Sequence, residues 1–430
     1  MKKSIIISSA DGLIVVGLLE NDQVCELYVE RGRDSRLLGN IYLGTVMDLI
    51  PSMQAAFVDI GFEKNAFLYL KDVRPNTADI DEVVSEDAKE AWKERDITKL
   101  LTAGQQIIVQ VAKEPYQNKG ARLTTYLTVP GRHLVLLPHL DHIGISHRLQ
   151  ESRSRDRLTD VIARLRPDRR GYIIRTKAIN ADEQSLRAEL EFLQRMWQGL
   201  RNQLTGAQPR QLVHRDSSLL LRICRDYYDE EVDEVIVDDA GILEEVRAIS
   251  RDLQLSLQNR LHFQGGDFSL AQQYGLDREL ELALREKVWL KGGSYLLFEA
   301  TEALTTIDVN SGKCVGAGEV EEMVFNINVS AVPEIVRQIR LRNISGVIIA
   351  DFIDMELPSH REQLLNVLEA ELKRDRIRSV LVDMTPLGLV EITRKRESQS
   401  LHEIVAVPCP HCNGRGHFHI AEVDNFIKGL

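Results

Sequence analysis

Long hydrophobic runs are missing from this 430-residue sequence, and cysteine and aromatic residues are sparse. No apolar run reaches the length of about 20 residues that a transmembrane helix needs. The apolar stretch after Lys2 and Lys3 is also too short for a secretory signal peptide. Of the five cysteines only Cys409 and Cys412 lie close together in sequence, which argues against a disulfide framework. These absences predict a cytoplasmic protein in a reducing compartment.

An excess of basic residues is lacking as well. The formal net charge is -11, which at first argues against a nucleic-acid partner. Phosphate binding depends on the local field over a groove, however, and the charge is unevenly distributed. Between His147 and Arg175 the chain has nine arginines against four acids, whereas acids gather from Asp72 to Asp96. We expect about half of these arginines to lie on a solvated helix face.

Apolar residues are plentiful and follow regular patterns. They make up 43% of the chain, enough for several cores and for two or more domains. Residues 3 to 30 contain three apolar runs separated by Asp11-Gly12 and Asn21-Asp22, which predicts an antiparallel meander with tight turns. Short strands and turns follow from about residue 39 to 127.

Two aliphatic segments within residues 301 to 354 run into carboxylates. One ends at Asp308 and the other at Asp351, with a helical pattern between them. A strand-helix-strand unit would place both aspartates at one sheet edge, with Asn310 on the same strand face as Asp308. Hard oxygen ligands suit Mg²⁺, with waters or phosphate oxygens filling its remaining positions, so we predict a metal site for phosphate chemistry. The alternative is that each aspartate caps a helix or turn after its strand.

Three segments follow one another in a fixed order: EALTTIDVNSG (302–312), QIRLRNISGVIIADFIDM (338–355) and GLVEITRKR (388–396). Together they resemble the catalytic-domain signatures of the bacterial ribonuclease E/G family, and the resemblance extends from about Ile5 to Gly416. It implies a Mg²⁺-dependent endoribonuclease that hydrolyses single-stranded RNA to 5′-phosphate and 3′-hydroxyl ends in RNA processing, rRNA processing and mRNA decay.

The resemblance assigns roles to the residues of the metal site. Asp308 and Asp351 would bind Mg²⁺, which would activate water and stabilise charge on the scissile phosphate. Asn310 would orient the ligands or the attacking water through its amide. Asp354 has the opposite strand parity to Asp351, so we expect it to be structural or to support the ligands.

The implied fold is α+β and multidomain. A ribonuclease-H-like subdomain, similar in fold only, would comprise residues 1–38 and 218–283. It would be interrupted by an OB-type RNA-binding barrel at 39–127 and a 5′-end sensor at 128–217. After these follow a DNase-I-like catalytic subdomain (284–403), a zinc link (404–416) and the start of a small domain (417–430). Family members use that small domain to pair dimers into tetramers, so we expect a homodimer, a tetramer only where the domain is present, and a chain that is either truncated or naturally short.

The barrel carries the predicted contacts to RNA. OB-type barrels bind single strands by stacking bases on aromatic rings beside basic side chains. The resemblance implies that Phe57 and Phe67 contact RNA, and that Lys113 in Val-Ala-Lys-Glu does likewise. The alternative for each phenylalanine is burial in the core of the barrel.

The segment GYIIRT (171–176) is the predicted sensor of the RNA 5′ end. An arginine fork and a neighbouring hydroxyl can form a site for a terminal monophosphate. A triphosphate would be too large for such a site. The resemblance assigns these roles to Arg175 and Thr176 and implies a preference for 5′-monophosphorylated RNA. The alternative for Arg175 is a surface ion pair. The family usually continues with Ala-Gly where this chain has Lys177-Ala178, a change that bears on discrimination between 5′ ends.

Arg378 aligns with a further arginine that helps to fix this phosphate in the family. Arg374 and Arg376 are close in sequence and are alternatives if the register differs.

Cys409 and Cys412 form a Cys-x-x-Cys knuckle, which supplies half of a tetrahedral Zn²⁺ site. Three completions are open: the same pair from a second subunit, local histidines among His411, His417 and His419, or no metal and a redox dithiol. The resemblance favours a zinc ion shared between two protomers.

Two other classes of function compete with a ribonuclease. One is an RNA-binding scaffold with an inactive metal site, against which the intact Asp308, Asn310 and Asp351 argue. The other is a Mg²⁺ phosphodiesterase that acts on DNA. Cleavage of matched RNA and DNA strands, with and without Mg²⁺, separates these possibilities.

Overall fold

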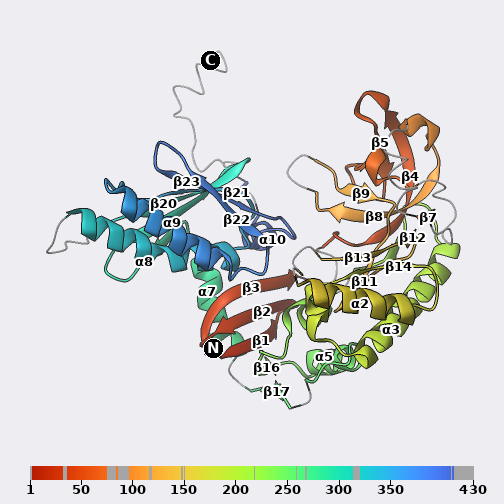
Figure 1. The fold of residues 1–430 in the computed structure, drawn as a ribbon, viewed down its shortest axis with the longest axis horizontal. Helices are drawn as coiled ribbons and strands as arrows, with labels where there is room; N and C mark the ends of the chain where they lie inside the picture. The colour runs from red at the N-terminus through yellow and green to blue at the C-terminus, as the bar shows by residue number, and fades with distance from the viewer. Residues whose placement is uncertain are drawn as a thin grey trace. The chain divides into compact units, whose positions relative to one another are not determined.

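The computed structural model describes residues 2–31, 36–74, 84–85, 96–115, 119–146, 149, 151–216, 218–257, 259–266, 269–312, 320–407 and 409–410. The chain divides into two compact units, one formed by Met1–Gln23 and Glu30–Tyr274 and the other by Val24–Val29 and Gly275–Leu430. Helices and strands occur in both, so the fold is α+β, as expected (Figure 1).

The structure confirms the meander predicted at the start of the chain. Strands β1 (Lys3–Ala10) and β2 (Leu13–Glu20) pair along their whole length, and β3 (Gln23–Arg31) follows after a second two-residue turn. Asp11 and Gly12 have positive φ, as do Asn21 and Asp22, which is the backbone that tight hairpin turns require. β1 also pairs in parallel with β16 (Glu234–Val237), and β16 pairs with β17 (Leu261–Phe263).

A closed five-stranded barrel follows in the first unit. Its strands are β4 (Ile41–Ile50), β5 (Ala55–Asp59), β6 (Ala66–Tyr69), β9 (Arg122–Thr124) and β8 (Gln106–Lys113), and β8 pairs back onto β4 to close it. β15 (Leu212–His214) adds to the outside of β4. The interior is filled by residues that alternate along each strand, such as Val58, Leu68 and Val109.

A four-stranded sheet with two helices completes the larger part of this unit. Its order is β10 (Val129–Pro130), β11 (Leu134–Leu137), β14 (Gly171–Ile174) and β13 (Ile143–Ile145). Helix α3 (Glu183–Thr205) buries one apolar stripe in the core next to α2 (Ser152–Leu165). The remaining elements described in this unit are β7 (Val84–Ser85), β12 (Leu140–Asp141), α4 (Leu219–Arg222), a π-helical turn (Ile223–Tyr227), α5 (Ala240–Asp252), α6 (Leu270–Gln273) and the 3₁₀ turns Pro51–Met53, Leu70–Asp72, Ile97–Lys99 and Thr176–Asn180.

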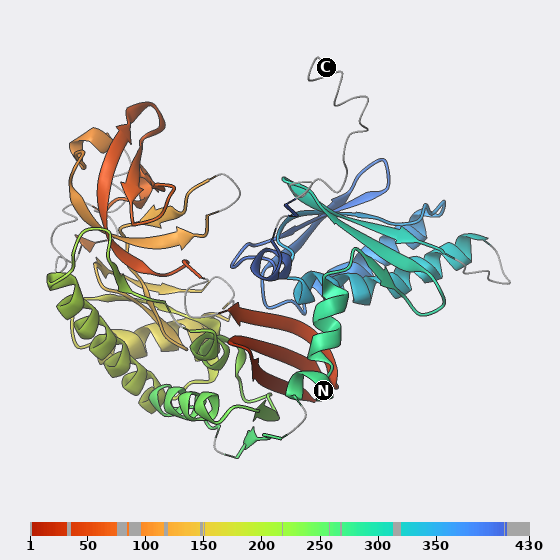
Figure 2. The same ribbon diagram turned by 180° about the vertical axis from the view of Figure 1, so that it is seen from behind.

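The second unit is a six-stranded sheet with two long helices on one face (Figures 1 and 2). The strand order is β18 (Lys287–Trp289), β19 (Tyr295–Ala300), β20 (Leu304–Asn310), β21 (Gly346–Asp351), β23 (Leu389–Arg394) and β22 (Ser379–Met384). The helices are α8 (Val320–Leu341) and α9 (Pro358–Leu372), and the shorter α7 (Leu276–Ala283) and α10 (Leu401–Val405) flank the sheet in sequence. The predicted strand-helix-strand unit is therefore confirmed as β20-α8-β21.

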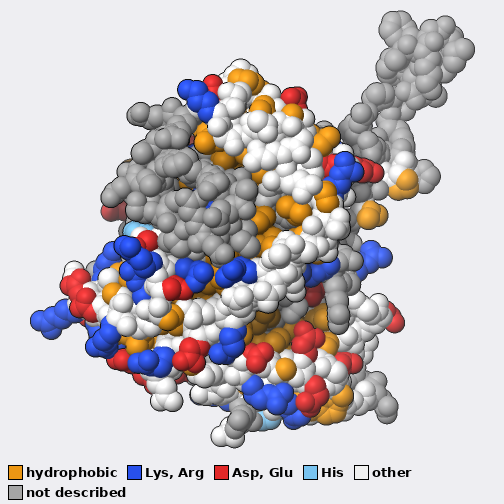
Figure 3. All heavy atoms as spheres, turned by 90° about the vertical axis from the view of Figure 1, so that its right-hand side faces the viewer, with side chains coloured by type: hydrophobic (Ala, Val, Ile, Leu, Met, Phe, Trp, Pro, Cys, Tyr) orange, Lys and Arg blue, Asp and Glu red, His pale blue; other side chains and the backbone are white. Residues whose placement is uncertain are grey.

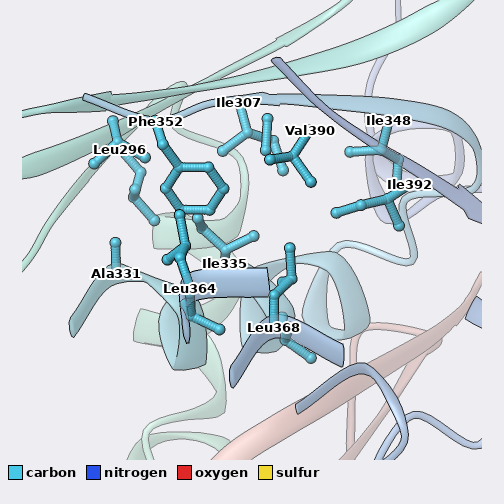
Figure 4. Close-up of a cluster of buried hydrophobic side chains, with 14 of the residues drawn as sticks. Leu296, Ile307, Ala331, Ile335, Ile348, Phe352, Leu364, Leu368, Val390 and Ile392 are labelled. Atoms are coloured by element: carbon cyan, nitrogen blue, oxygen red, sulfur yellow. The ribbon is translucent and has the colours of Figure 1, made fainter. Parts of the chain in front are cut away.

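The core of the second unit lies between the sheet and these helices. Figure 4 shows Ile307, Ile348 and Ile392 pointing from neighbouring strands toward Ile335 of α8 and Leu368 of α9. Burying each such side chain contributes on the order of 1.5–3 kcal/mol, so the covered face holds the sheet rigid. Among the described residues the other face is open, since Val347, Val380 and Trp289 of opposite strand parity are exposed. Within the described ranges, no helix has the length and apolar character needed to cross a bilayer.

Candidate functional site

Asp308, Asn310 and Asp351 meet on the open face of the second unit's sheet. Asp308 and Asp351 are direct register partners on the parallel strands β20 and β21. The Nδ2 of Asn310 donates a hydrogen bond of 2.6 Å to Oδ2 of Asp308. Both aspartates stand at the carboxyl ends of their strands, where open α/β sheets commonly bind ligands. The expected shared sheet edge is thus present, and the helix that follows Asp351, α9, has Leu357 at its N-cap instead of Asp351.

Negative charge is concentrated here. Burial raises the pKa of Asp351, and the neighbouring carboxylates of Asp308 and Asp354 raise that pKa further. Asp354 is exposed and lies three residues beyond the end of β21. Its carboxylate therefore belongs to the same acidic group without sharing the strand register of Asp351. Adjacent carboxylates of this kind are stabilised by a cation.

Two side chains of α8 hold the segment that follows Asp351. Asn328 is fully buried, donates to the carbonyl of Ile353 at 2.8 Å and accepts from its N–H at 3.1 Å. Glu321 accepts from the backbone N–H groups of Glu356 and Leu357. These bonds hold the backbone next to Asp351 and Asp354 in place, whereas strand pairing ends at Asp351.

A glycine allows the loop after β20 to approach its neighbour. Gly312 has φ of +58°, and a Cβ at this position would lie 2.2 Å from the carbonyl oxygen of Gly293. Only glycine fits both the backbone angle and the close approach. The turn directly after Asn310 therefore depends on this residue.

The donor set fits Mg²⁺. Two carboxylates and a neighbouring amide are hard oxygen donors, and Mg²⁺ commonly uses one or two protein carboxylates together with water or phosphate oxygens. Among the residues with a described placement, no group of three or more His, Cys, Asp and Glu side chains could hold a metal ion. A cation at this edge would therefore depend on Asp308 and Asp351 and leave most of its positions to water and substrate.

The aromatic pair of the barrel lies outside its core. Phe57 and Phe67 are register partners, their rings are 5.3 Å apart in an edge-to-face arrangement, and both are half-buried. Their strand neighbours Ala56 and Leu68 fill the interior instead. The alternative that these rings are buried in the barrel core is therefore wrong, because both rings point away from the core.

Lys113 lies in the same row of residues, two strands from Phe67. Phe67 is paired with Arg122 on β9, and Arg122 is paired with Lys113 on β8. Lys113 is exposed. The structure therefore brings the three predicted barrel residues onto one outer face.

Sequence reasoning missed two members of this face. Arg122 lies over the ring of Tyr69 at 5.0 Å, and that ring is 4.6 Å from the ring of Phe67. Arg122 also forms an ion pair with Asp72 at 2.6 Å. The alternation of Phe67 and Tyr69 along one strand was the available signal for Tyr69, whereas Arg122 is brought there by a parallel pairing of distant segments.

Arg175 directly follows strand β14 and is held by a partner from another part of the first unit. Its guanidinium donates to Oδ1 of Asp226 at 2.7 Å and to the carbonyl of Gly131 at 2.5 Å. Burial opposes ionisation of Asp226, but Arg225 and Arg175 bring its pKa down to about 2. The ion pair predicted as the alternative for Arg175 is therefore present, and it is largely buried instead of lying at the surface. Thr176 is half-buried and opens the 3₁₀ turn that follows.

Lys177, which departs from the usual family pattern, is turned toward the backbone. Its Nζ donates to the carbonyls of Arg225 and Tyr228, at the π-helical turn and just after it. This ammonium group therefore ties the sensor segment to that turn.

The arginine-rich segment before Arg175 is extensively paired. Arg166 and Arg169 bind Asp141, Arg170 pairs with Asp168, and Arg164 pairs with Glu183. On the face shown in Figure 3, Lys and Arg side chains lie beside Asp and Glu side chains instead of forming one continuous basic patch. About half of these arginines were expected on a solvated helix face, and Arg153, Arg157 and Arg164 are exposed on α2.

The remaining predicted residues lie elsewhere. Arg378 is exposed, directly before β22 of the second unit. Cys409 is exposed. Cys412 and the histidines that could complete the zinc site, His411, His417 and His419, lie outside the described residues.

Comparison with known proteins agrees with this arrangement. Residues 128–397 match the model of the Ribonuclease E/G family. The chain is 37% identical to "Ribonuclease G" of Salmonella typhimurium (strain SL1344) and 38% identical to "Ribonuclease G" of Haemophilus influenzae, in each case over 401 residues that cover 93% of this chain and 81% of the relative. It is 36% identical to "Ribonuclease E" of Synechocystis sp. over 425 residues, which are 97% of this chain and 60% of the relative. The chain belongs to the ribonuclease E/G family.

Proposed function

We propose that this protein is a Mg²⁺-dependent endoribonuclease that cleaves single-stranded RNA within the cytoplasm, in RNA processing, including rRNA processing, and in mRNA decay. One observation carries the proposal: Asp308 and Asp351 are register partners at a sheet edge, with Asn310 bonded to Asp308. Such an acidic pair beside an open face suits a phosphodiester substrate and a divalent cation. The names of the relatives, Ribonuclease G and Ribonuclease E, support the choice of RNA.

The chain's own residues divide the work at the proposed site. Asp308 and Asp351 hold Mg²⁺, which supplies charge stabilisation and water activation when it is bound. Asn310 fixes the orientation of the Asp308 carboxylate through the bond from its Nδ2. Asn328 and Glu321 hold the segment after Asp351, so that the carboxylate of Asp351 is placed before substrate arrives. Hydrolysis leaves a 5′-phosphate and a 3′-hydroxyl.

The barrel binds the single strand in this proposal. Around the barrel the hydrogen-bonded neighbours are β4, β5, β6, β9 and β8, and β8 pairs with β4. This order suits an OB-type barrel. The outward rings of Phe57 and Phe67 offer stacking faces, and Lys113 on the same face attracts the phosphate backbone.

The other assignments follow the family. We propose a ribonuclease-H-like subdomain at 1–38 and 218–283, a sensor at 128–217 and a DNase-I-like subdomain at 284–403. In the sensor, Arg175, Thr176 and Arg378 favour a 5′-monophosphate. A zinc ion held by Cys409 and Cys412 joins two protomers at residues 404–416. Asp226 already neutralises part of the Arg175 fork, so a terminal phosphate shares that guanidinium with a carboxylate.

The proposal is tested by cleavage of one single-stranded RNA in 5′-monophosphate and 5′-hydroxyl forms. We expect the intact protein to cut in Mg²⁺, to prefer the monophosphate, and to lose at least about 100-fold in rate with Asp308→Asn, because the substitution removes a proposed metal ligand. Asp383→Asn is the matched control, since Asp383 is an exposed aspartate on β22 of the same sheet.

Each outcome of this experiment has a defined meaning. Cutting without preference for a 5′ end would keep the nuclease and discard Arg175 and Thr176 as a working sensor. Equal loss in Asp308→Asn and Asp383→Asn would remove the assignment of the metal site. Cleavage of a matched DNA strand at the same rate would favour a general phosphodiesterase, and binding of RNA with no cutting would favour a scaffold.

A further inference from the structure

An aromatic pair lies on the open face of the second unit's sheet, beside the proposed metal residues. Trp289 on β18 is 63% exposed, an unusual exposure for the largest apolar side chain. Its ring lies 5.2 Å from that of Tyr295 on β19, in an edge-to-face arrangement. The Nζ of Lys287 lies 4.1 Å from the centroid of the Trp289 ring and 3.5 Å from that of Tyr295.

Strand register connects this group to Asn310 and Asp308. Trp289 pairs with Tyr295, and Tyr295 pairs with Asn310. In the adjoining row Lys287 pairs with Leu297, which pairs with Asp308. Direct register partners share one face of a sheet, and neighbouring strands are about 4.8 Å apart. On this face Tyr295 therefore lies one strand from the strand of Asp308 and Trp289 lies two strands from it, and each ring lies one strand farther from Asp351.

We propose that Trp289 and Tyr295, together with Lys287, form a stacking platform for an RNA base next to the scissile phosphate. The proposal rests on the proposed function and adds a subsite to it. Aromatic faces stack on any base, and a lysine at the same place attracts the adjoining phosphate. A base held here fixes the phosphate that follows it over Asp308 and Asp351. Trp289 and Tyr295 are thus positioning residues for the bond that is cut.

The three side chains fit a nucleotide better than a purely apolar partner. A protein interface of the usual kind keeps charge away from the centre of its aromatic patch. Here the ammonium of Lys287 lies over both rings, and the carboxylates of Asp308 and Asp351 follow in the next strands of the same face. Across this face the rings would contact a base, the ammonium of Lys287 would contact the adjoining phosphate, and the carboxylates would hold the divalent cation at that phosphate.

The first test measures binding without cutting. In an Asp308→Asn background, a short single-stranded RNA should bind roughly 5- to 100-fold more weakly after Trp289→Ala, the loss expected for one stacked base. Trp289→Phe should recover most of the affinity because it keeps an aromatic face. Phe263→Ala is the matched control, since Phe263 is an exposed aromatic residue at 52% on a strand of the other unit, and it should change nothing. Tryptophan fluorescence should be quenched by the RNA, and this quenching should be lost in Trp289→Phe.

The second test locates the stacked base. Cleavage of RNAs with one abasic nucleotide at successive positions should show a single position, next to the cut, where the base matters to the intact protein but not to Trp289→Ala. A fall in affinity with no such position would reduce the platform to general surface attraction and overturn the proposal. If Trp289→Ala changes the oligomeric state in solution but leaves RNA binding unchanged, the patch is a contact between copies of the chain and the proposal is overturned. If the intact protein cuts no RNA but base-dependent quenching remains, the proposed nuclease fails while the stacking site stands.

Discussion

The pair formed by Arg175 and Asp226 has a consequence for stability that depends on pH. The folded-state pKa of Asp226 is about 2, whereas the ordinary value for aspartate is 3.8. Although burial raises this pKa, Arg225 and Arg175 lower it by a larger amount. A difference of this size is worth about 2 kcal/mol of folding free energy. Because the folded pKa is depressed, this contribution is fully present above about pH 4 and is lost as the pH falls toward 2.

Asp226→Asn should therefore lower the melting temperature of the protein at pH 7, because it removes the carboxylate that pairs with both Arg225 and Arg175. The difference from the intact protein should shrink as the pH falls from about 4 to 2, because the folded intact protein loses the same charge only near its pKa of about 2. Thermal unfolding followed at several pH values checks this trend. A difference that stays constant down to about pH 2 would show that the charge of Asp226 contributes nothing. Asp252→Asn, at the exposed last residue of α5, is a suitable reference.

Among the elements, helix α8 determines how well Asp351 is placed. Asn328→Ala removes both hydrogen bonds to the half-buried backbone of Ile353, at a cost of up to about 1–3 kcal/mol for each group. We expect kcat for RNA cleavage to fall about 10- to 100-fold while KM changes little, because the proposed ligands lose their position but the stacking surfaces remain.

Asn326→Ala provides the matched control on the same helix. Asn326 is exposed, two residues before Asn328, so its loss should leave both stability and kcat unchanged. Steady-state cleavage kinetics and thermal unfolding of both variants check the prediction. Equal losses in kcat and in affinity for Asn328→Ala would point to unfolding of the region instead of misplacement of the carboxylates.

Elements with strong local signals could be predicted from the sequence. The turns at Asp11-Gly12 and Asn21-Asp22 and the unit β20-α8-β21 depend on residues that are close in the chain, and the structure contains them. The partners that complete each site could not be predicted in this way. Asp226 is 51 residues from Arg175, and Asn328 is 25 residues from Ile353. Such contacts form only when distant segments pack together, and neither residue has a spacing that marks it.

For the molecule as a whole, the net charge of -11 is a poor guide to the proposed partner. Most arginines of the basic segment are matched by nearby acids, as Arg166 and Arg169 are by Asp141. The features that suit RNA are local instead: outward aromatic rings, a few lysines on the same faces, and an acidic edge for a cation. Binding should therefore depend on stacking as well as on phosphate contacts, with a modest dependence on salt.

The oligomeric state follows from the proposed zinc link, and zinc content distinguishes the three completions of the knuckle. We expect one zinc ion for every two chains and a dimer by light scattering, because Cys409 and Cys412 supply only half of a tetrahedral site. A strong chelator, or replacement of both cysteines by serine, should give monomers. Replacement of His411, His417 and His419 by alanine should leave the dimer intact. One zinc ion per chain that is lost when the histidines are replaced would instead indicate a local site. A dimer that contains no zinc would overturn the link, since only a shared ion makes the zinc stoichiometry and the oligomeric mass change together.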